Sequence, residues 1–111
     1  MFGSGNIEKL LTKHKGDKVE KMFDKADKKG KLDIVEKMSK VNRDESSAIL
    51  CTIVHNSDPD IRLAAVKALG VVGFSPAITH LRRLAGEETD PKIKDAISAS
   101  LAALQEKFHT A

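Results

Sequence analysis

Four histidines are the side chains best suited to acid–base or metal chemistry in this chain of 111 residues: His14, His55, His80 and His109. No two of them lie three or four residues apart, and no cysteine or carboxylate completes a metal-ligand spacing with them. We interpret His55 as a residue in the last turn of a helix, where an imidazole can meet the carbonyl end of the helix dipole. The histidines therefore predict neither a metal site nor a bound cofactor.

The other potentially reactive groups predict structural roles. Cys51 lies on an apolar-rich segment, which favours a buried small side chain over a reactive thiol. The adjacent Glu87 and Glu88 fall in a connection between two expected helices, and we expect both to face solvent. The glycines at 3–5 form no phosphate-binding loop, and Gly70 is expected to allow close helix packing. We therefore expect a protein that is not an enzyme.

Two adjacent arginines are the main candidates for a binding function. The chain has 15 lysines and 4 arginines, so the pair Arg82–Arg83 is not explained by solubility alone. On the helix expected at 76–86, they and the nearby Thr79 and His80 fall opposite the apolar side chains. Arginine pairs bidentately with carboxylates and is enriched at interfaces. We predict that these four residues contact an acidic protein or peptide.

The two arginines have another possible interpretation, and three further residues could belong to the same polar face. The arginines could instead solubilise the helix or form ion pairs with Glu87 and Asp90. The matching helix upstream would add Ser47, Thr52 and His55 to the same polar face.

Basic residues are concentrated in the first part of the chain. Residues 1–44 carry 12 Lys or Arg against 8 Asp or Glu, whereas residues 45–111 carry 7 against 8. Nucleic-acid binding through this Lys-rich half is therefore an alternative function. Interleaved acidic residues and the absence of tryptophan and tyrosine favour a solvated face instead.

Composition and sequence pattern indicate the cellular compartment in which we expect the protein. The single cysteine excludes an internal disulfide and fits a reducing compartment. The longest apolar run is far below the roughly 20 residues of a membrane span. The N-terminal residues show no secretory signal pattern. We expect a cytoplasmic monomer with no membrane segment.

Prolines mark three helix starts. They follow Asp58, Ser75 and Asp90, which predicts an N-cap before a proline in the first helical turn. Apolar side chains recur at helical spacing after each start, which predicts helices over about 59–72, 76–86 and 91–108. We expect Gly73 and Gly86 to end the first two helices, with Gly73 in the left-handed conformation.

Weaker helical patterns precede these three helices. They begin at Asn6 and Asp44, which we expect to act as caps, at Gly16, and after Gly30. Shifted by 31 residues, the apolar positions of 30–41 match those of the first proline-marked helix, which predicts a degenerate copy of it.

One helix recurs along the chain. Residues 57–73 read SDPDIRLAAVKALGVVG and residues 89–104 read TDPKIKDAISASLAAL, so the same pattern returns after 32 residues. Recurrence of a helix pair at this period is the signature of a helical solenoid, in which neighbouring units bury each other's apolar stripes. Through Asp58-Pro59, Ala64-Ala65 and Ala68-Leu69-Gly70, the segment 56–104 resembles the short HEAT repeats of phycobilisome-lyase-like proteins.

The chain departs from that repeat pattern at two positions. In such repeats the residue six before the arginine is usually Asp and joins an inter-repeat ladder of ion pairs. This chain has Asn56 at that position, and Glu88 in the next copy. We therefore expect the ladder to be partly lost.

The resemblance implies an all-α fold of six or seven helices, stacked as antiparallel hairpins in a short right-handed α-solenoid. We expect one domain over 1–111, with degenerate or capping hairpins at 1–55 and clear repeats at 56–111. In such proteins the second helices line a concave, partner-binding face, which implies a non-enzymatic protein- or peptide-binding scaffold. A lyase-type accessory role follows only from the family analogy.

Overall fold

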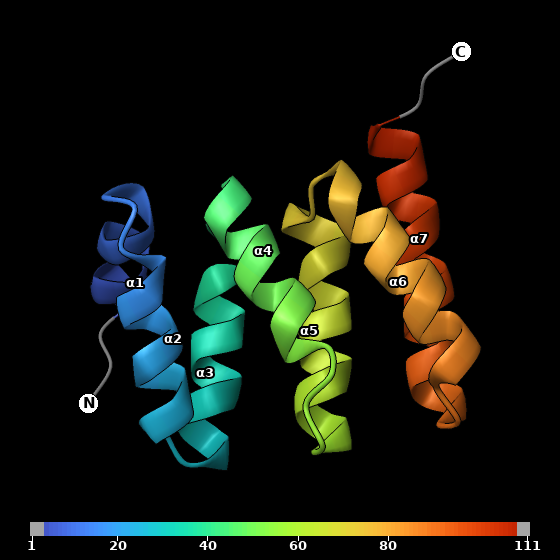
Figure 1. Ribbon diagram of the computed structural model, residues 1–111, viewed down its shortest axis with the longest axis horizontal. Coiled ribbons are helices and arrows are strands. Elements are labelled where there is room, and N and C mark those ends of the chain that lie inside the picture. The colour runs from blue at the N-terminus through green and yellow to red at the C-terminus, as the bar shows by residue number, and fades with distance from the viewer. Residues whose placement is uncertain (1–3, 109–111) are drawn as a thin grey trace.

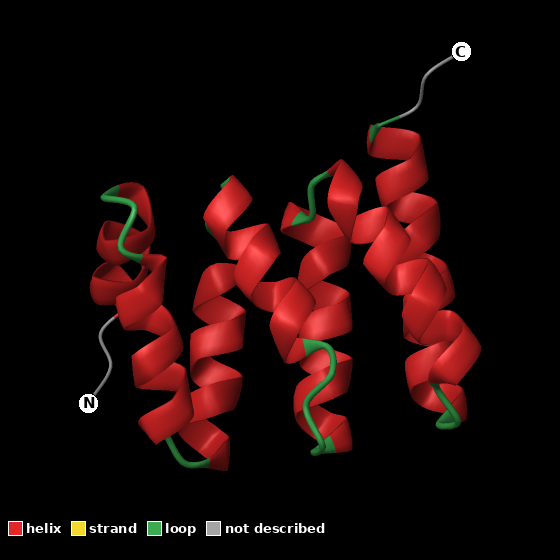
Figure 2. Cartoon of the chain, in the orientation of Figure 1, coloured by secondary structure: helices red, strands yellow, loops and turns green. Residues whose placement is uncertain are grey.

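The computed structural model describes residues 4–108 and shows seven α-helices joined by short turns (Figure 1 and Figure 2). No residue in this described range belongs to a β-strand. The helices are α1 (Ser4–Thr12), α2 (Gly16–Lys25), α3 (Lys28–Met38), α4 (Asp44–Ile53), α5 (Pro59–Val72), α6 (Ser75–Glu87) and α7 (Pro91–Lys107). The all-α prediction and the expected number of helices are confirmed, while His109 lies outside the described residues.

The helices form two layers along the longest axis of the molecule (Figure 1). One layer contains α1, α3, α5 and α7, each packed on the next, and the second layer contains α2, α4 and α6. The Cα atoms extend over 39 × 31 × 16 Å, so the molecule is about two helices thick in its shortest direction. This arrangement confirms the predicted short α-solenoid.

The core lies between the two layers, and α5 is at its centre. This helix packs against α3, α4 and α7, and its side chains Ala65, Val66 and Leu69 are fully buried. In the second layer α4 packs along α5, and α6 packs along α7. The helical spacing of apolar residues therefore identified the buried face of α5 correctly.

A close approach of α5 and α7 depends on Gly70. A Cβ atom at this position would lie 2.6 Å from the Ser100 hydroxyl oxygen, closer than side-chain atoms normally come. The same hydroxyl donates a buried hydrogen bond of 2.8 Å to the Val66 carbonyl oxygen of α5. The expected role of Gly70 in close packing is confirmed.

Two of the three proline-marked caps are confirmed. The carboxylates of Asp58 and Asp90 each accept a hydrogen bond of 2.9 Å from the backbone N–H two residues later. The prediction for Ser75 is wrong, because Phe74 is the N-cap of α6 and makes no side-chain capping bond. The Phe74 N–H donates to the Ser47 hydroxyl oxygen (3.0 Å), and this tertiary contact holds Phe74 extended, just outside the helix.

The two earlier cap predictions are also wrong. The helix α1 already starts at Ser4, so Asn6 lies inside it. Asp44 is the first residue of α4 and follows the N-cap Arg43, which makes no side-chain capping bond. No proline follows Asn6 or Asp44, so the sequence does not mark the first helical turn there as it does after Asp58 and Asp90. Asp44 still places a negative charge near the positive end of the helix dipole.

Gly73 ends α5 as predicted, but its conformation and the place of Gly86 differ from the prediction. Gly73 follows α5 with φ −64° and ψ 145°, which is extended and not left-handed. Space is the reason for a glycine here, since a Cβ would overlap the Leu69 carbonyl oxygen and lie 3.1 Å from the Leu104 side chain. Gly86 lies inside α6, which continues to Glu87.

Candidate partner-binding surface

The four predicted binding residues lie on the solvent-facing side of α6. Thr79, His80, Arg82 and Arg83 are all exposed. The opposite side of the helix is anchored in the core by a set of buried apolar residues, which are Ala77, Leu81 and Leu84. The structure therefore presents the four side chains on a helix whose position is fixed by packing.

In the part of the chain that it describes, the structure does not show the ion pairs with nearby acids that were the alternative role of the two arginines. Among residues 4–108 neither Arg82 nor Arg83 forms an ion pair, with Glu87, with Asp90 or with any other described residue. Asp90 instead caps α7. Both guanidinium groups are therefore available to a partner.

The upstream helix contributes only part of the expected polar face. Thr52 and His55 are exposed on or just after α4, as predicted. Ser47 is buried, because its hydroxyl oxygen accepts the hydrogen bond from the Phe74 N–H described above. The prediction that Ser47 faces a partner is therefore wrong, and its role is to fix the start of α6.

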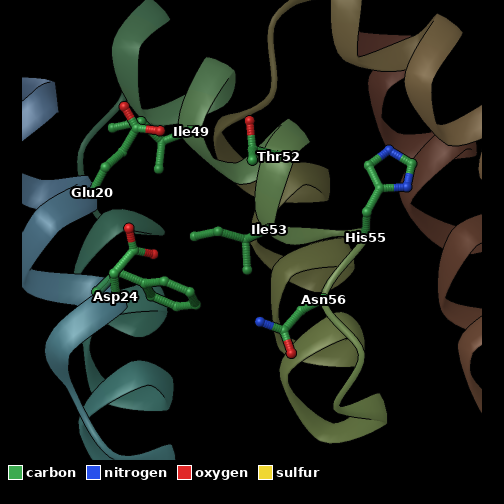
Figure 3. A pocket seen from close by; sticks show the side chains of 8 residues that line it. Glu20, Asp24, Ile49, Thr52, Ile53, His55 and Asn56 are labelled. Atoms are coloured by element: carbon green, nitrogen blue, oxygen red, sulfur yellow. The ribbon is translucent and has the colours of Figure 1, made fainter.

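A pocket between α2 and α4 was not predicted from the sequence (Figure 3). It has a volume of about 190 Å³. Its floor consists of buried apolar side chains, and its walls are polar; the lining residues are Glu20, Phe23, Asp24, Ile49, Thr52, Ile53, His55 and Asn56. The spacing of four between Glu20 and Asp24 places both on one face of α2, but no local pattern connects them to α4.

A second, shallower pocket continues this surface toward α6. It has a volume of about 270 Å³ and shares His55 and Asn56 with the first pocket. Its remaining lining residues include Leu84 and Glu87 of α6. The exposed edge of the second layer is thus hollowed on both sides of the end of α4.

A buried ion pair joins the first turn of α5 to the connection between α6 and α7. The guanidinium group of Arg62 donates to both carboxylate oxygens of Glu88, at 3.0 and 3.1 Å, and the Glu88 side chain is only 3% exposed. The expectation that Glu88 faces solvent is wrong. The inter-repeat ladder, which we expect to be partly lost, is kept at this rung, since a glutamate reaches the arginine as the usual aspartate would.

Several donors converge on the same carboxylate. The Glu88 oxygens also accept hydrogen bonds from the backbone N–H groups of Thr89 and Asp90, at 3.2 and 3.1 Å. The hydrogen bonds from Arg62 are the main cause that lowers the pKa of the Glu88 carboxyl below its usual value. Glu88 is therefore ionised in the folded protein and organises the turn before α7.

The other departure, Asn56, has a local role in its own turn. Its side-chain oxygen accepts a hydrogen bond of 2.8 Å from the Asp58 N–H, and its carbonyl oxygen accepts one of 3.2 Å from Arg62. Arg62 also donates to the Ser57 carbonyl oxygen at 3.2 Å. Thirty-one residues earlier, Lys31 donates to the carbonyl oxygen of Ala26 in the same way, at 2.8 Å. The repeat is thus preserved in its turn contacts even where the sequence pattern is weak.

A second cluster of charges ties α3 to the start of α5. The Lys28 amino group lies 2.7 Å from Asp60 and 3.3 Å from Asp58. The hydrogen bond to Asp60 is the main cause that raises the pKa of Lys28 above its usual value. This lysine of the basic N-terminal half therefore serves the stacking of the helices.

Two of the groups considered for chemistry, His14 and Cys51, occupy structural positions. The His14 imidazole is hydrogen-bonded to Glu45 at 2.7 Å, and the same carboxylate accepts from the Gly16 N–H at 3.0 Å, which fixes the α1–α2 turn on α4. Cys51 is buried, as predicted, and burial raises the pKa of its thiol. In residues 4–108 no three His, Cys, Asp or Glu side chains are grouped to hold a metal ion. No helix of this range is long and apolar enough to cross a membrane.

The two layers of repeated helices, linked by the Arg62–Glu88 pair, define an α-solenoid of the helical-repeat class. A family model described as HEAT repeats matches residues 17–102, which is more than three quarters of the chain. The chain therefore belongs to the HEAT-repeat family. HEAT repeats commonly serve as scaffolds for protein interactions and are generally not enzymes. No curated protein and no solved structure matches the chain.

Proposed function

We propose that this chain is a scaffold that binds a protein or peptide partner across its second layer, through Arg82 and Arg83, with Thr79 and His80 at the edge of the contact. The observation that carries the proposal is the state of the two guanidinium groups. Both are exposed, and neither has an ion-pair partner within residues 4–108.

An acidic partner is the one that fits these groups best. A guanidinium group offers a planar set of donors that matches a carboxylate, and it is more weakly hydrated than an ammonium group. Packing already fixes the helix that carries Arg82 and Arg83, so a partner does not have to order the backbone on binding. Acidic side chains of a partner would therefore gain paired hydrogen bonds at a low entropic cost.

Three of the twelve basic residues in the N-terminal half make contacts that weigh against nucleic acid. Lys28, Lys31 and Lys37 of the basic N-terminal half are each bound within the chain, to Asp58 and Asp60, to the Ala26 carbonyl oxygen and to Asp33. A phosphate backbone would have to compete with these contacts. Nucleic-acid binding therefore stays an alternative without a supporting contact.

The test compares partners captured by the wild type and by the double variant Arg82→Glu/Arg83→Glu. We expect the variant to lose the partner, with affinity reduced at least about tenfold, because attraction becomes repulsion at two positions. Lys92→Glu/Lys94→Glu is the matched control: it changes the charge equally at two exposed positions of α7. Equal affinity of both variants for the captured partner, with unchanged circular dichroism, would show that the arginines are ordinary surface residues.

The type of repeat and the family analogy add a narrower proposal. We infer that the repeats are of the short, phycobilisome-lyase-like type, on the strength of the segments 57–73 and 89–104. The lyase-type accessory role stays a prediction from the analogy alone.

A further inference from the structure

The pocket between α2 and α4 has the size and floor of a site for one apolar side chain. Phe23, Ile49 and Ile53 form its floor and are 5–6% exposed, so they are part of the core and are held in place by it. Its volume of about 190 Å³ exceeds that of a cavity of roughly 150 Å³ that binds benzene in another protein. A leucine, isoleucine or phenylalanine side chain of a partner would fill this space and would no longer be exposed to water.

The charge of the pocket is negative and is not neutralised by the described chain. Glu20 and Asp24 line the α2 side, are exposed, and form no ion pair with any residue in 4–108. Lys28, the first residue of α3, is bound instead to Asp58 and Asp60. The amino group of Lys31 lies 5.5 Å from the centre of the Phe23 ring but forms no ion pair with Glu20 or Asp24. A partner can therefore supply the cation that pairs with these two carboxylates.

The α4 side of the pocket is polar and uncharged apart from one histidine. Thr52 and Asn56 offer a hydroxyl and an amide there, and His55 lies at the end toward α6 (Figure 3). Each of these groups can hydrogen-bond to the backbone of an extended peptide. One wall thus provides charge and the other provides neutral hydrogen-bonding groups.

We propose that this pocket binds a peptide segment of a partner protein in which an apolar residue is followed or preceded by a lysine or arginine. The apolar side chain lies over Phe23, Ile49 and Ile53, and the cation pairs with Glu20 and Asp24. This inference rests on the proposed function only in placing the partner on the second layer, since it uses none of the arginines of α6.

The test uses short capped synthetic peptides that differ only at two central positions, which are Leu-Arg, Leu-Glu or Ser-Arg. Methyl NMR of the full chain reports binding at Ile49 and Ile53, even for weak, millimolar affinity. We expect the Leu-Arg peptide to shift both isoleucine signals and to bind at least about tenfold more tightly than either other peptide. No shift with the Leu-Arg peptide, or equal binding of the Leu-Glu peptide, would overturn the proposal.

Charge variants separate recognition from folding. Glu20→Gln/Asp24→Asn should weaken the Leu-Arg peptide about tenfold, the equivalent of about 1.4 kcal/mol, which is the size expected for two exposed ion pairs. Glu20→Lys/Asp24→Lys should reverse the preference in favour of Leu-Glu. The matched control is Asp95→Asn/Glu106→Gln, which removes two exposed negative charges on α7 and should change nothing.

The variants of α6 distinguish this inference from the proposed function. Arg82→Glu/Arg83→Glu should leave the binding of the Leu-Arg peptide unchanged, because the peptide contacts α2 and α4. If that variant loses the natural partner while the peptide never binds to wild type, the proposed function stands and the pocket proposal fails. If the pocket variants change peptide binding and the α6 variant keeps the natural partner, the reverse holds.

Discussion

Removal of the Glu88 side chain should destabilise the protein more than any other change of a charged residue considered for this chain. In Glu88→Ala the Arg62 guanidinium group loses two short hydrogen bonds to a carboxylate, and two backbone N–H groups of the turn lose their acceptor. The carboxylate is nearly inaccessible, with 3% of its side chain exposed, so the wild-type bonds are made within the protein and not to water.

The size of the stability loss depends on how far other contacts still satisfy the Arg62 charge after Glu88 is removed. Breaking a buried ion pair by removing one partner costs about 3–5 kcal/mol. Arg62 is 20% exposed and keeps its bonds to the carbonyl oxygens of Asn56 and Ser57, so its charge is partly satisfied without Glu88. We therefore expect Glu88→Ala to lower the free energy of unfolding by about 3 kcal/mol, the lower end of that range.

Urea denaturation followed by far-UV circular dichroism measures this loss. The matched control is Glu87→Ala, one residue away, where the exposed side chain makes no ion pair with residues 4–108 and the expected change is within about 0.5 kcal/mol. A double-mutant cycle with Arg62→Met should return most of the loss as coupling energy. Losses of equal size for Glu87→Ala and Glu88→Ala would refute the assignment of Glu88 as a buried structural residue.

Acid should remove the same stabilisation from the wild type. The bonds from Arg62 hold the pKa of Glu88 below its ordinary value of 4.5. A carboxyl with a lowered folded-state pKa stabilises fully above its ordinary value, and this contribution is lost as the pH falls through the lower value of the folded state. The stability difference between wild type and Glu88→Gln should therefore be constant from neutral pH to about 4.5 and shrink below it. A difference that persists down to acid unfolding would contradict this.

Three further predictions concern helix packing, capping and the thiol. Gly86→Ala should stabilise the protein by about 0.4–1 kcal/mol, since nothing lies within 4 Å of its new Cβ. Gly70→Ala should destabilise it, because its Cβ meets α7. Thermal unfolding should therefore show a higher melting temperature for the first variant and a lower one for the second. Asp90→Ala should cost about 0.5–2 kcal/mol through loss of the α7 cap, and Ser75→Ala should be near neutral in the same urea assay. Iodoacetamide should alkylate Cys51 at least about tenfold more slowly in the native protein than in urea, because burial raises the pKa of the thiol; equal rates would mean that it is accessible.

The sequence was sufficient for the helices because their signals are local. An aspartate before a proline satisfies an N–H group within the same turn, so Asp58 and Asp90 could be identified as caps without the fold. Ser75 also precedes a proline, but the prediction that it caps α6 is wrong, because its neighbour Phe74 is held by Ser47 from another helix. Gly73 ends α5 as predicted, but its conformation is extended and not left-handed, and the contact that requires a glycine there is steric.

The candidate site was only partly predictable for the same physical reason. The exposure of Arg82 and Arg83 follows from their place opposite the apolar stripe of one helix. The pocket is lined by residues of α2 and α4. Even the two lining residues of these helices that are closest in sequence, Asp24 and Ile49, are far apart along the chain. The burial of Glu88 likewise depends on Arg62, which reaches it from the preceding repeat. Contacts of this kind exist only once the helices are stacked.

Charged residues of this small array divide into those that pair within the stack and those that we propose to contact a partner. Pairs such as Arg62–Glu88 and Lys28–Asp60 hold the turns and the first layer together. On the second layer, the carboxylates of Glu20 and Asp24 on α2 are opposite in charge to the guanidinium groups of Arg82 and Arg83 on α6. None of the four forms an ion pair within residues 4–108, and neutral Thr52 lies on α4, the helix between α2 and α6. Two helix-to-helix steps separate them, roughly 20 Å at typical packing distances, which an extended peptide spans in about six residues. A partner with a basic and an acidic end at this spacing would therefore be recognised by the order of its charges, and the residues that recognise it can change without weakening the stack.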